Sequence, residues 1–405
     1  MGLIVQKFGG SSVANAERVF NVAKTITDTY KPGNDVVVVV SAQGDTTDDL
    51  IEKAKEINKK PSKREMDMLL STGEQISISL LAMAIESLGF PVISLTGWQA
   101  GMTTNANYGI ARLAKINTER LELELGKRNI VVVAGFQGIN KYDDITTLGR
   151  GGSDTSAVAL AAALGADVCE IYTDVDGVYT TDPRIVKTAA KLDEISYDEM
   201  LELASLGANV LNNRSVEMAK KYNVKLMVLS SLHKASGTIV KEVSNVEKML
   251  VRGVTRDNDT ARISLIEVED TPGKAFQTFS LLAKHNINVD LIIQSVGRSG
   301  TKDISFTVAE SNLDDALKVL KDNEAVIGAK DIVWDSNVSK VSIVGAGMVT
   351  NPGVASGMFE ALYKAHINIH MIATSEIKVS VLIDRKDAEK AVVAIHDQFD
   401  MSNIK

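Results

Sequence analysis

Six short apolar runs, many of them rich in Val and Ile, alternate with long helical patterns between residues 3 and 230. An apolar run without alternating polar residues is typical of a strand buried on both faces, and alternation with helices is typical of a parallel sheet. The sequence therefore predicts an α/β fold of three layers, in which helices cover a mostly parallel sheet. The expected strands are residues 3–5, 36–40, 92–95, 130–134, 168–172 and 226–229.

Four polar segments begin where four of these predicted strands end. Ligands of open α/β sheets bind outside the carboxyl ends of the strands, so we expect the four segments to converge on one edge. Each segment alone could be a loop of turn residues, but four such loops are less easily explained by coincidence. The segments are residues 7–12, 41–48, 135–138 and 173–179.

Residues 148–157 read Leu-Gly-Arg-Gly-Gly-Ser-Asp-Thr-Ser-Ala and stand directly before a run of small residues that predicts a packed helix. Glycines allow close approach of a ligand, and the free N–H groups and dipole of a helix start favour an anion. This stretch therefore predicts a phosphate or carboxylate site. An ordinary turn capped by Ser153 or Asp154 is the alternative, but it explains neither the paired Gly151-Gly152 nor the adjacent Arg150.

Two further residues belong to the same edge. The segment 71–75 precedes a helical run at 76–88, which puts Glu74 in or near the first turn, where the helix dipole alone could explain a carboxylate. Arg184 lies in the loop that continues from residue 179 and is a second candidate phosphate ligand, although a solvated surface arginine is equally compatible with the sequence.

Composition and missing motifs exclude several classes. The formal net charge is −8 without a block of Lys and Arg, which argues against nucleic acid as the main partner. The P-loop motif, Gly-x-Gly-x-x-Gly after a strand and the protein-kinase signatures are absent. Cys169 is the only cysteine and stands in an apolar segment, so we expect a core residue. The sequence shows neither a secretory signal nor an apolar run of membrane-spanning length, so we expect a cytoplasmic protein.

The C-terminal part repeats itself at an offset of eighty residues. Each copy predicts the order β-α-β-β-α-β, which is the ferredoxin-like arrangement, and small units of this kind expose edges that favour self-association. The Pro-Gly turn that opens each first helix could hold an amino acid, or could be only a helix entry. The repeated residues are Pro272, Gly273, Ala275, Phe279, Leu282, Lys284, Ile287 and Asn288, matched by Pro352, Gly353, Ala355, Phe359, Leu362, Lys364, Ile367 and Asn368.

Taken together, segments 7–12, 41–48, 73–74, 149–157 and 173–184 resemble the aspartokinases of the amino-acid kinase superfamily, and the C-terminal repeat resembles their tandem ACT domains. The resemblance implies transfer of the γ-phosphoryl group of MgATP to the side-chain carboxylate of L-aspartate, giving 4-phospho-L-aspartate on the route to lysine, threonine and methionine. It also implies a catalytic domain at 1–231, a linker at 232–251 and ACT units at 252–335 and 336–405.

The resemblance also implies roles for single residues. An acceptor that is already an anion needs no strong general base, so positioning and charge neutralisation should suffice. Mg²⁺ is expected to arrive with ATP, without a dedicated protein ligand. The implied catalytic residues are Lys7 and Asp154. The implied aspartate ligands are Thr47, Glu74, Arg150, Gly151 and Ser153. The implied nucleotide ligands are Lys7, Phe8, Gly9, Gly10, Thr173, Asp174, Tyr179, Asp182, Arg184, Asn209 and Val210.

Regulation and assembly are further expectations. Lysine, threonine or both should inhibit the enzyme through the ACT units, and these units should form a homodimer or a larger homo-oligomer; nucleic acid and membrane are not expected as partners. The sequence does not tell which of these effectors applies. The implied effector ligands are Asp270, Pro272, Gly273, Ala275, Asn288, Asp290, Gln294, Asn368 and Ile369.

One departure and two alternatives remain at this point. Asn212 and Asn213 stand where many relatives carry His-Pro, which puts any side-chain role of that histidine in doubt. A related kinase for glutamate, acetylglutamate, carbamate or a nucleoside monophosphate is one alternative. The other is an amino-acid-sensing protein with an inactive kinase half, against which the joint presence of Lys7, Arg150 and Asp154 argues.

Overall fold

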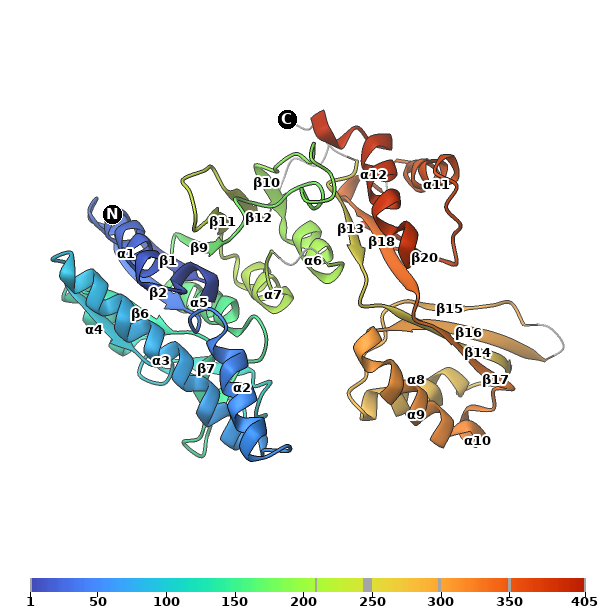
Figure 1. The fold of residues 1–405 in the computed structure, drawn as a ribbon, viewed down its shortest axis with the longest axis horizontal. Coiled ribbons are helices and arrows are strands. Elements are labelled where there is room, and N and C mark those ends of the chain that lie inside the picture. The colour runs from blue at the N-terminus through green and yellow to red at the C-terminus, as the bar shows by residue number, and fades with distance from the viewer. Residues whose placement is uncertain (1, 208–209, 243–249, 298–299, 349–350, 404–405) are drawn as a thin grey trace. The chain divides into compact units, whose positions relative to one another are not determined.

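The computed structural model describes residues 2–207, 210–242, 250–297, 300–348 and 351–403 (Figure 1). The chain forms two compact units that interleave in sequence. The N-terminal unit comprises Met1–Val178, Lys191–Ala204 and Asn209–Ser244, and the C-terminal unit comprises Tyr179–Ala190, Ser205–Ala208 and Asn245–Lys405. Two short segments inside the predicted catalytic domain, residues 179–190 and 205–208, therefore fold with the C-terminal unit. The domain boundaries at residues 231, 251 and 335 stay a prediction.

The N-terminal unit is built on an eight-stranded sheet in the order β10-β12-β11-β9-β1-β2-β6-β3. All six predicted strands are present and pair in parallel with one another, which confirms the predicted mostly parallel α/β sheet. Only β12 runs antiparallel to its neighbour β11. The strands are β1 (Leu3–Phe8), β2 (Asp35–Val40), β3 (Val92–Leu95), β6 (Ile130–Ala134), β9 (Val168–Thr173), β10 (Glu194–Ser196), β11 (Leu226–Ser230) and β12 (Thr238–Lys241).

Helices cover both faces of this sheet, which explains why β2 and β6 are apolar along almost their whole length. Val38 belongs to a core cluster with side chains of α1 and α3, whereas Val39 points to the opposite face, near Ser153 of α5. Cys169 of β9 is fully buried, so its predicted core position is confirmed. The helices are α1 (Ala16–Tyr30), α2 (Thr46–Ile57), α3 (Lys63–Ser87), α4 (Glu119–Gly126), α5 (Gly152–Leu164), α6 (Tyr197–Ser205) and α7 (Asn213–Tyr222).

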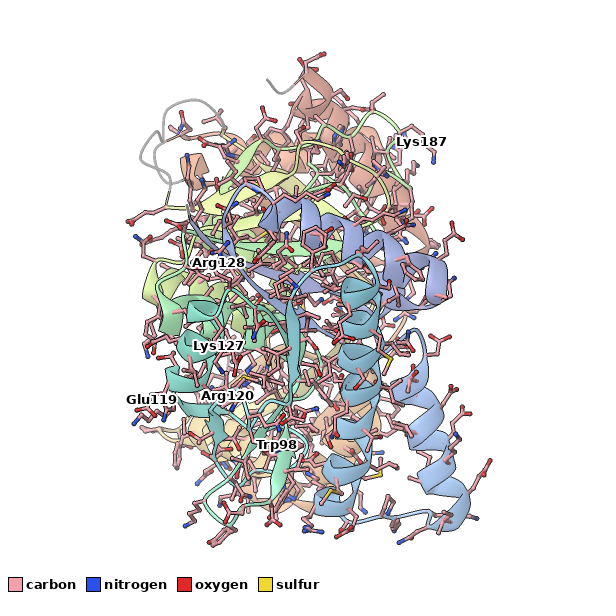
Figure 2. All side chains as sticks on the ribbon, turned by 90° about the vertical axis from the view of Figure 1, so that its left-hand side faces the viewer. Trp98, Glu119, Arg120, Lys127, Arg128 and Lys187 are labelled. Carbon is pink, nitrogen blue, oxygen red and sulfur yellow. The ribbon has the colours of Figure 1, made fainter. Side chains whose placement is uncertain are left out.

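A second, smaller sheet in the order β5-β4-β7-β8 completes the N-terminal unit. Its strands are β4 (Met102–Thr104), β5 (Leu113–Ile116), β7 (Gln137–Ile139) and β8 (Ile145–Thr147). Elsewhere on the unit, Figure 2 labels four charged residues at the two ends of α4: Glu119 and Arg120 in its first turn, and Lys127 and Arg128 in the turn that follows it.

The expected start of the helix around Glu74 is wrong. α3 begins at Lys63, with Ser62 as its N-cap, so Glu74 lies in the middle of a 25-residue helix and the helix dipole does not explain its carboxylate. Gly73 does not interrupt the helix. It is required because a Cβ atom at this position would lie only 2.8 Å from the Cβ of Ala42.

Among the described residues, α3 is the only helix long and apolar enough to cross a membrane, with a mean hydropathy of 1.4 over its most apolar window. The sequence analysis did not anticipate a window of this length. Half of that window is buried inside the fold, and core helices of this kind pass the same test, so the finding is weak support for a membrane span.

The C-terminal unit contains two four-stranded antiparallel sheets, in the orders β15-β16-β14-β17 and β13-β18-β20-β19. Helices α8 and α9 pack on the first sheet through one core cluster, and α11 and α12 pack on the second through another. The first repeat consists of β14 (Ala261–Glu269), α8 (Lys274–Lys284), β15 (Ile292–Gln294), β16 (Thr301–Val308), α9 (Leu313–Asp322), α10 (Glu324–Ile327) and β17 (Asp331–Asp335). The second consists of β18 (Val338–Val344), α11 (Val354–Lys364), β19 (Met371–Thr374), β20 (Lys378–Asp384) and α12 (Ala388–Gln398), joined by β13 (Gly253–Asp257).

The strand order of the second repeat differs from the expectation. The first repeat has the predicted order β-α-β-β-α-β, but the fourth strand of the second sheet is β13, which precedes the first repeat in the chain. β13 pairs with β18 from Gly253–Val344 to Asp257–Lys340 and buries Val254 in the core of the second repeat. Residues 253–257, assigned from the sequence to the first ACT unit, therefore complete the second one.

Candidate active site

A pocket of about 740 Å³ lies in the N-terminal unit at the carboxyl ends of β1 and β2. It receives residues from three of the four polar segments predicted to converge and from the glycine-rich stretch, whereas segment 173–179 contributes none. Nine of the predicted site residues line this pocket together: Lys7, Gly9, Gly10, Thr47, Glu74, Arg150, Gly151, Ser153 and Asp154.

The glycine-rich stretch forms a tight turn into α5. Gly149 and Gly151 have φ values of 79° and 70°, which glycine adopts readily, and Gly151 is the N-cap of the helix. Ser153 and Asp154 lie within the first helical turn, so the alternative in which one of them caps the helix is wrong. No side chain caps α5, and the N–H of Gly152 donates to the carbonyl of Gly149, so the N–H groups of Ser153 and Asp154 are the ones that can bind an anion in the pocket.

A buried ion pair links β1 to this helix start. The Nζ atom of Lys7 lies 2.6 Å from Oδ1 of Asp154, and the two side chains are only 13% and 10% exposed. The ammonium group also lies beside Gly9, 3.6 Å from where a Cβ atom would stand. Asp154 thus holds a positive charge next to the glycine backbone, an arrangement suited to phosphoryl oxygens.

Arg150 presents an exposed guanidinium group at the rim of the pocket. In the described part of the chain its side chain has no hydrogen bond or ion pair. It can therefore bind a ligand carboxylate with both of its terminal nitrogens, without first breaking a contact within the protein.

Glu74 projects from the middle of α3 into the same pocket and is 3% exposed. Its Oε1 accepts a hydrogen bond of 3.1 Å from the backbone N–H of Ala42, while Oε2 has no hydrogen-bond partner among the described residues. Burial raises the pKa of Glu74 to about 8, against a small opposing effect of the Ala42 bond. A buried carboxyl group with one open oxygen is a suitable partner for a ligand ammonium group.

The sequence analysis missed Asp67, a second carboxylate on the same face of α3. Its Oδ2 accepts hydrogen bonds from the N–H groups of Gly109 (2.9 Å) and Thr147 (3.0 Å), and its Oδ1 accepts one from the Thr147 hydroxyl (2.6 Å). Asp67 is buried, which raises its pKa, and it joins two walls of the pocket. The sequence contains one indication of Asp67: it stands seven residues before Glu74, a spacing that puts both side chains on one face of a helix. This indication can be used only if the helix is known to begin before Asp67.

Arg214 and Asn212 support the glycine-rich turn from α7. The guanidinium of Arg214 donates to the carbonyl oxygens of Leu148 (2.6 Å) and Ala111 (3.1 Å). The side chain of Asn212 caps α7 and donates to the carbonyl of Arg150 at 3.2 Å. Asn212 also lies so close to Gly151 that a Cβ atom there would collide with its side chain. The asparagine that replaces the usual histidine therefore has a structural function in this chain.

The predicted nucleotide ligands are divided between the units. Thr173 ends β9, and its hydroxyl donates to Asp174 at 3.0 Å. The ring of Phe8 is buried and stacks on Tyr172 with centroids 4.5 Å apart, which leaves only the backbone of Phe8 for a ligand. Val210 lies in a turn before α7, and Asn209 lies outside the described residues. The remaining three, Tyr179, Asp182 and Arg184, belong to the C-terminal unit.

Most of the predicted effector ligands lie in turns of the two repeats, whereas Ala275 belongs to α8 and Gln294 to β15. Gly273 is the left-handed N-cap of α8, next to Pro272 and Ala275, and Asn368 and Ile369 follow α11. Asp270 pairs with Lys302 at 2.7 Å, and Asp290 contacts the ammonium of Lys340. Apart from Ile369, which packs partly against the second repeat's core, these residues are exposed. In the described part of the chain, no group of three or more His, Cys, Asp or Glu residues could hold a metal ion.

Comparison with known proteins agrees with this geometry. Residues 2–230 match the amino acid kinase family, and residues 264–323 and 341–399 match an ACT domain. An aspartokinase from Bacillus sp. (strain MGA3) is 52% identical over 403 residues, which is 99% of this chain and 98% of the relative.

Two solved structures resemble the chain over nearly its whole length. E. coli aspartokinase III in complex with aspartate and ADP, in the R-state, has a TM-score of 0.81 at 26% identity and covers 98% of this chain and 100% of its own. The same enzyme in complex with lysine and aspartate, in the T-state, has a TM-score of 0.75 at 26% identity, with 98% and 99% coverage.

Proposed function

The chain belongs to the aspartokinases of the amino acid kinase family, and on that basis we propose how its own residues bind L-aspartate and MgATP and make 4-phospho-L-aspartate. The observation that carries the proposal is the Lys7–Asp154 ion pair, which stands beside Gly9 and the uncapped start of α5 in one pocket. A cation and free N–H groups are what a migrating phosphoryl group requires.

Phosphoryl transfer to a carboxylate needs neutralisation of charge more than proton removal. Lys7 and the N–H groups of Gly9 and Gly10 would bind the transferring phosphoryl group, with Asp154 holding Lys7 in place. Mg²⁺ would neutralise further charge and would be bound mainly by the nucleotide phosphates. Among the described residues, no group of three or more His, Cys, Asp or Glu could hold a metal ion.

The aspartate ligands follow from charge. Arg150 has an open guanidinium group for the α-carboxylate, and Glu74 has an open carboxyl oxygen for the α-ammonium group. Thr47 and Ser153 would orient the reacting carboxylate near Lys7, and the left-handed Gly151 lets the backbone approach it. The E. coli relative crystallised with aspartate and ADP supports the identity of both ligands.

The nucleotide would be held by the backbone of Phe8, by Thr173 and Asp174, by Asn209 and Val210, and by Tyr179, Asp182 and Arg184. Arg184 is 89% exposed at its side chain and is oriented by Asp182. The support for this part of the proposal is the resemblance of segment 173–184 to the family pattern.

Lysine, threonine or both are the proposed inhibitors, acting through the two repeats, and homo-oligomerisation and a cytoplasmic location complete the proposal. The ACT match and the lysine complex of the E. coli relative support an amino-acid effector. The product would enter the biosynthesis of lysine, threonine and methionine.

The decisive experiment is the steady-state rate of ATP-dependent phosphorylation of L-aspartate, trapped as the hydroxamate, with and without millimolar lysine and threonine. Activity suppressed by either amino acid is expected. Activity insensitive to both would remove the effector proposal and leave the kinase proposal. A complete lack of turnover, with amino-acid binding retained in equilibrium dialysis, would favour the sensing protein instead.

A further inference from the structure

The segment Tyr179–Ala190, called here the inserted segment, leaves the N-terminal unit after Val178 and returns to it at Lys191. Within the C-terminal unit it is part of the second repeat. Val186 is 5% exposed and belongs to the same core cluster as Val254 of β13, and Ile185 and Ala189 pack against that cluster. The inserted segment is therefore held by burial of apolar side chains.

Thr180 fixes the beginning of the inserted segment through four hydrogen bonds. Its N–H donates to the carbonyl of Ala190 at 2.9 Å, and its hydroxyl oxygen accepts from the N–H of Ala190 at 3.1 Å. Its carbonyl accepts from the N–H of Val254 in β13 at 2.7 Å. Its hydroxyl also meets Nε2 of His396 in α12 at 3.0 Å. One fully buried threonine thus closes the segment and binds it to a strand and a helix of the second repeat.

His396 has no exposed surface, and burial lowers its pKa, which keeps the imidazole neutral. Its other ring nitrogen, Nδ1, has no hydrogen-bond partner among the described residues, and the nearest carboxylate oxygen, on Asp397, is 4.0 Å away. Among the described residues, the bond to Thr180 is therefore the hydrogen bond that satisfies the His396 side chain at its buried position in α12.

The residues between these anchors are ordered by the same contacts. Asp182 accepts hydrogen bonds from the backbone N–H of Arg184 at 2.8 Å and from its guanidinium at 2.8–3.1 Å. The carbonyl of Asp182 accepts from the N–H groups of Ile185 and Val186, which begin the apolar anchor. The positions of Asp182 and Arg184 are consequently set by the second repeat.

β13 also contacts the other short segment of the C-terminal unit. Gly207 has a φ of 103°, and a Cβ atom at this position would collide with the carbonyl oxygen of Arg256. This segment leads directly to Asn209 and Val210. Both segments that lead to or carry proposed nucleotide ligands thus pack on one strand of the second repeat.

We infer that Thr180 and His396 are positioning residues for the nucleotide: they hold the inserted segment on β13 and α12 so that Tyr179, Asp182 and Arg184 are ordered for ATP. The inference rests on the proposed function, which assigns these three residues to ATP. It assigns to the second repeat a direct part in nucleotide affinity, in addition to any part in effector binding.

The test compares Thr180→Val and His396→Leu with the conservative variants Thr180→Ser and His396→Gln, which keep a hydroxyl group or a polar partner. Loss of one buried hydrogen bond should raise KM for ATP and Kd for ADP about 5- to 10-fold. KM for aspartate should change less than about twofold, since the aspartate ligands lie in the N-terminal unit. Both conservative variants should recover most of the nucleotide affinity.

A double-mutant cycle makes the test specific for the contact. If the two side chains act through one hydrogen bond, Thr180→Val/His396→Leu should be no weaker for ADP than Thr180→Val alone. His370→Gln is the matched control, because His370 also bonds a side chain of the second repeat, Asp384 at 2.7 Å, but not the inserted segment. It should leave KM for ATP unchanged.

Equal increases in both KM values, additive effects of the two substitutions, or unchanged nucleotide affinity would each overturn the inference. Thermal unfolding of every variant separates these outcomes from loss of the fold. Wild-type protein that does not phosphorylate aspartate would refute the proposed function alone. Calorimetric titration with ADP then still tests the inference, because it measures nucleotide affinity without turnover.

Discussion

The Glu74 carboxyl group is the clearest case in which burial changes the chemistry of a single side chain. Its pKa is about 8 in the folded protein, against 4.5 for the exposed group. Between these pH values the unfolded chain loses the Glu74 proton while the folded chain keeps it, so this group makes folding less favourable as the pH rises. At lower pH both states keep the proton, and no cost arises.

We therefore predict that Glu74→Gln gains stability over wild type between about pH 4.5 and pH 8, by at most about 1.4 kcal/mol per pH unit. Above pH 8 the difference should be constant, because both states of the wild type are then ionised. Urea unfolding at five pH values measures this difference. A stability difference that does not vary with pH would contradict the raised pKa.

Asp67 gives a prediction about affinity. Asp67→Asn keeps one oxygen for the N–H groups of Gly109 and Thr147, but it replaces the acceptor of the Thr147 hydroxyl with an amide N–H₂. We expect KM for aspartate to rise roughly 3- to 10-fold as the pocket walls loosen, with KM for ATP nearly unchanged. Steady-state kinetics with each substrate varied measures both. Asp28→Asn, which removes an exposed partner of Lys31, is the control and should change neither value.

Most of the candidate site was predicted from residue types in local motifs. The residues that were not predicted, Asp67 and Arg214, act through contacts between distant parts of the chain. Lys7, Arg150 and Asp154 stand in local motifs whose glycines and charges indicate an anion site, and the structure brings all three to one pocket. Asp67 and Arg214 act on backbone groups more than 40 residues away. No local pattern marks such partners, since they depend on how helices and loops pack.

α3 shows how packing overrides local propensity within one element. The sequence Ser71-Thr72-Gly73 has a low helix propensity, yet α3 continues through it. At Gly73 the helix packs closely against Ala42, in the turn after β2. This approach brings the N–H of Ala42 to the carboxylate of Glu74. The glycine thus allows α3 and the turn after β2 to be in contact.

Gly73→Ala tests this explanation. The added methyl group would lie 2.8 Å from the Cβ of Ala42, and the resulting shift should destabilise the protein by about 1–3 kcal/mol, although alanine favours the helix. KM for aspartate should rise as the Ala42–Glu74 bond lengthens. Gly126→Ala in α4 is the matched control, because no atom lies within 4 Å of its added methyl group. It should be neutral or stabilising by up to about 1 kcal/mol; an equal effect of both substitutions would refute the packing argument.

Six of the eight strands of the N-terminal sheet were predicted, because buried parallel strands leave a continuous apolar signal, whereas the short strands β10 and β12 were not. β13 was not predicted either, because the sequence of a five-residue strand does not indicate which sheet it joins. β13 joins the second sheet because it pairs with the edge of β18 in a regular antiparallel register and so satisfies the backbone hydrogen-bonding groups of that edge. Which repeat a strand joins depends on how the sheets assemble, and the hydrophobic periodicity of the strand's own sequence contains no information about it.

In the molecule as a whole, Lys340 is one of the residues that join the two repeats. It lies in β18 with 5% of its side chain exposed and contacts Asp257 of β13 at 3.3 Å and Asp290 of the first repeat. Asp290 is also a proposed effector ligand. An effector ammonium group must therefore compete with an ammonium group that the protein itself supplies.

From this competition we predict two effects of Lys340→Met. Removal of the buried cation leaves two carboxylates without a positively charged partner and should destabilise the C-terminal unit by roughly 1–3 kcal/mol. If lysine binds at Asp290, its half-inhibitory concentration should fall several-fold, because the internal competitor is gone. Lys330→Met removes an exposed pair with Glu267, 2.8 Å apart, and should change neither stability nor inhibition appreciably. Unfolding curves of the two variants measure the change in stability, and lysine titrations of their activity measure the half-inhibitory concentration. An unaltered half-inhibitory concentration in Lys340→Met would remove Asp290 from the effector site.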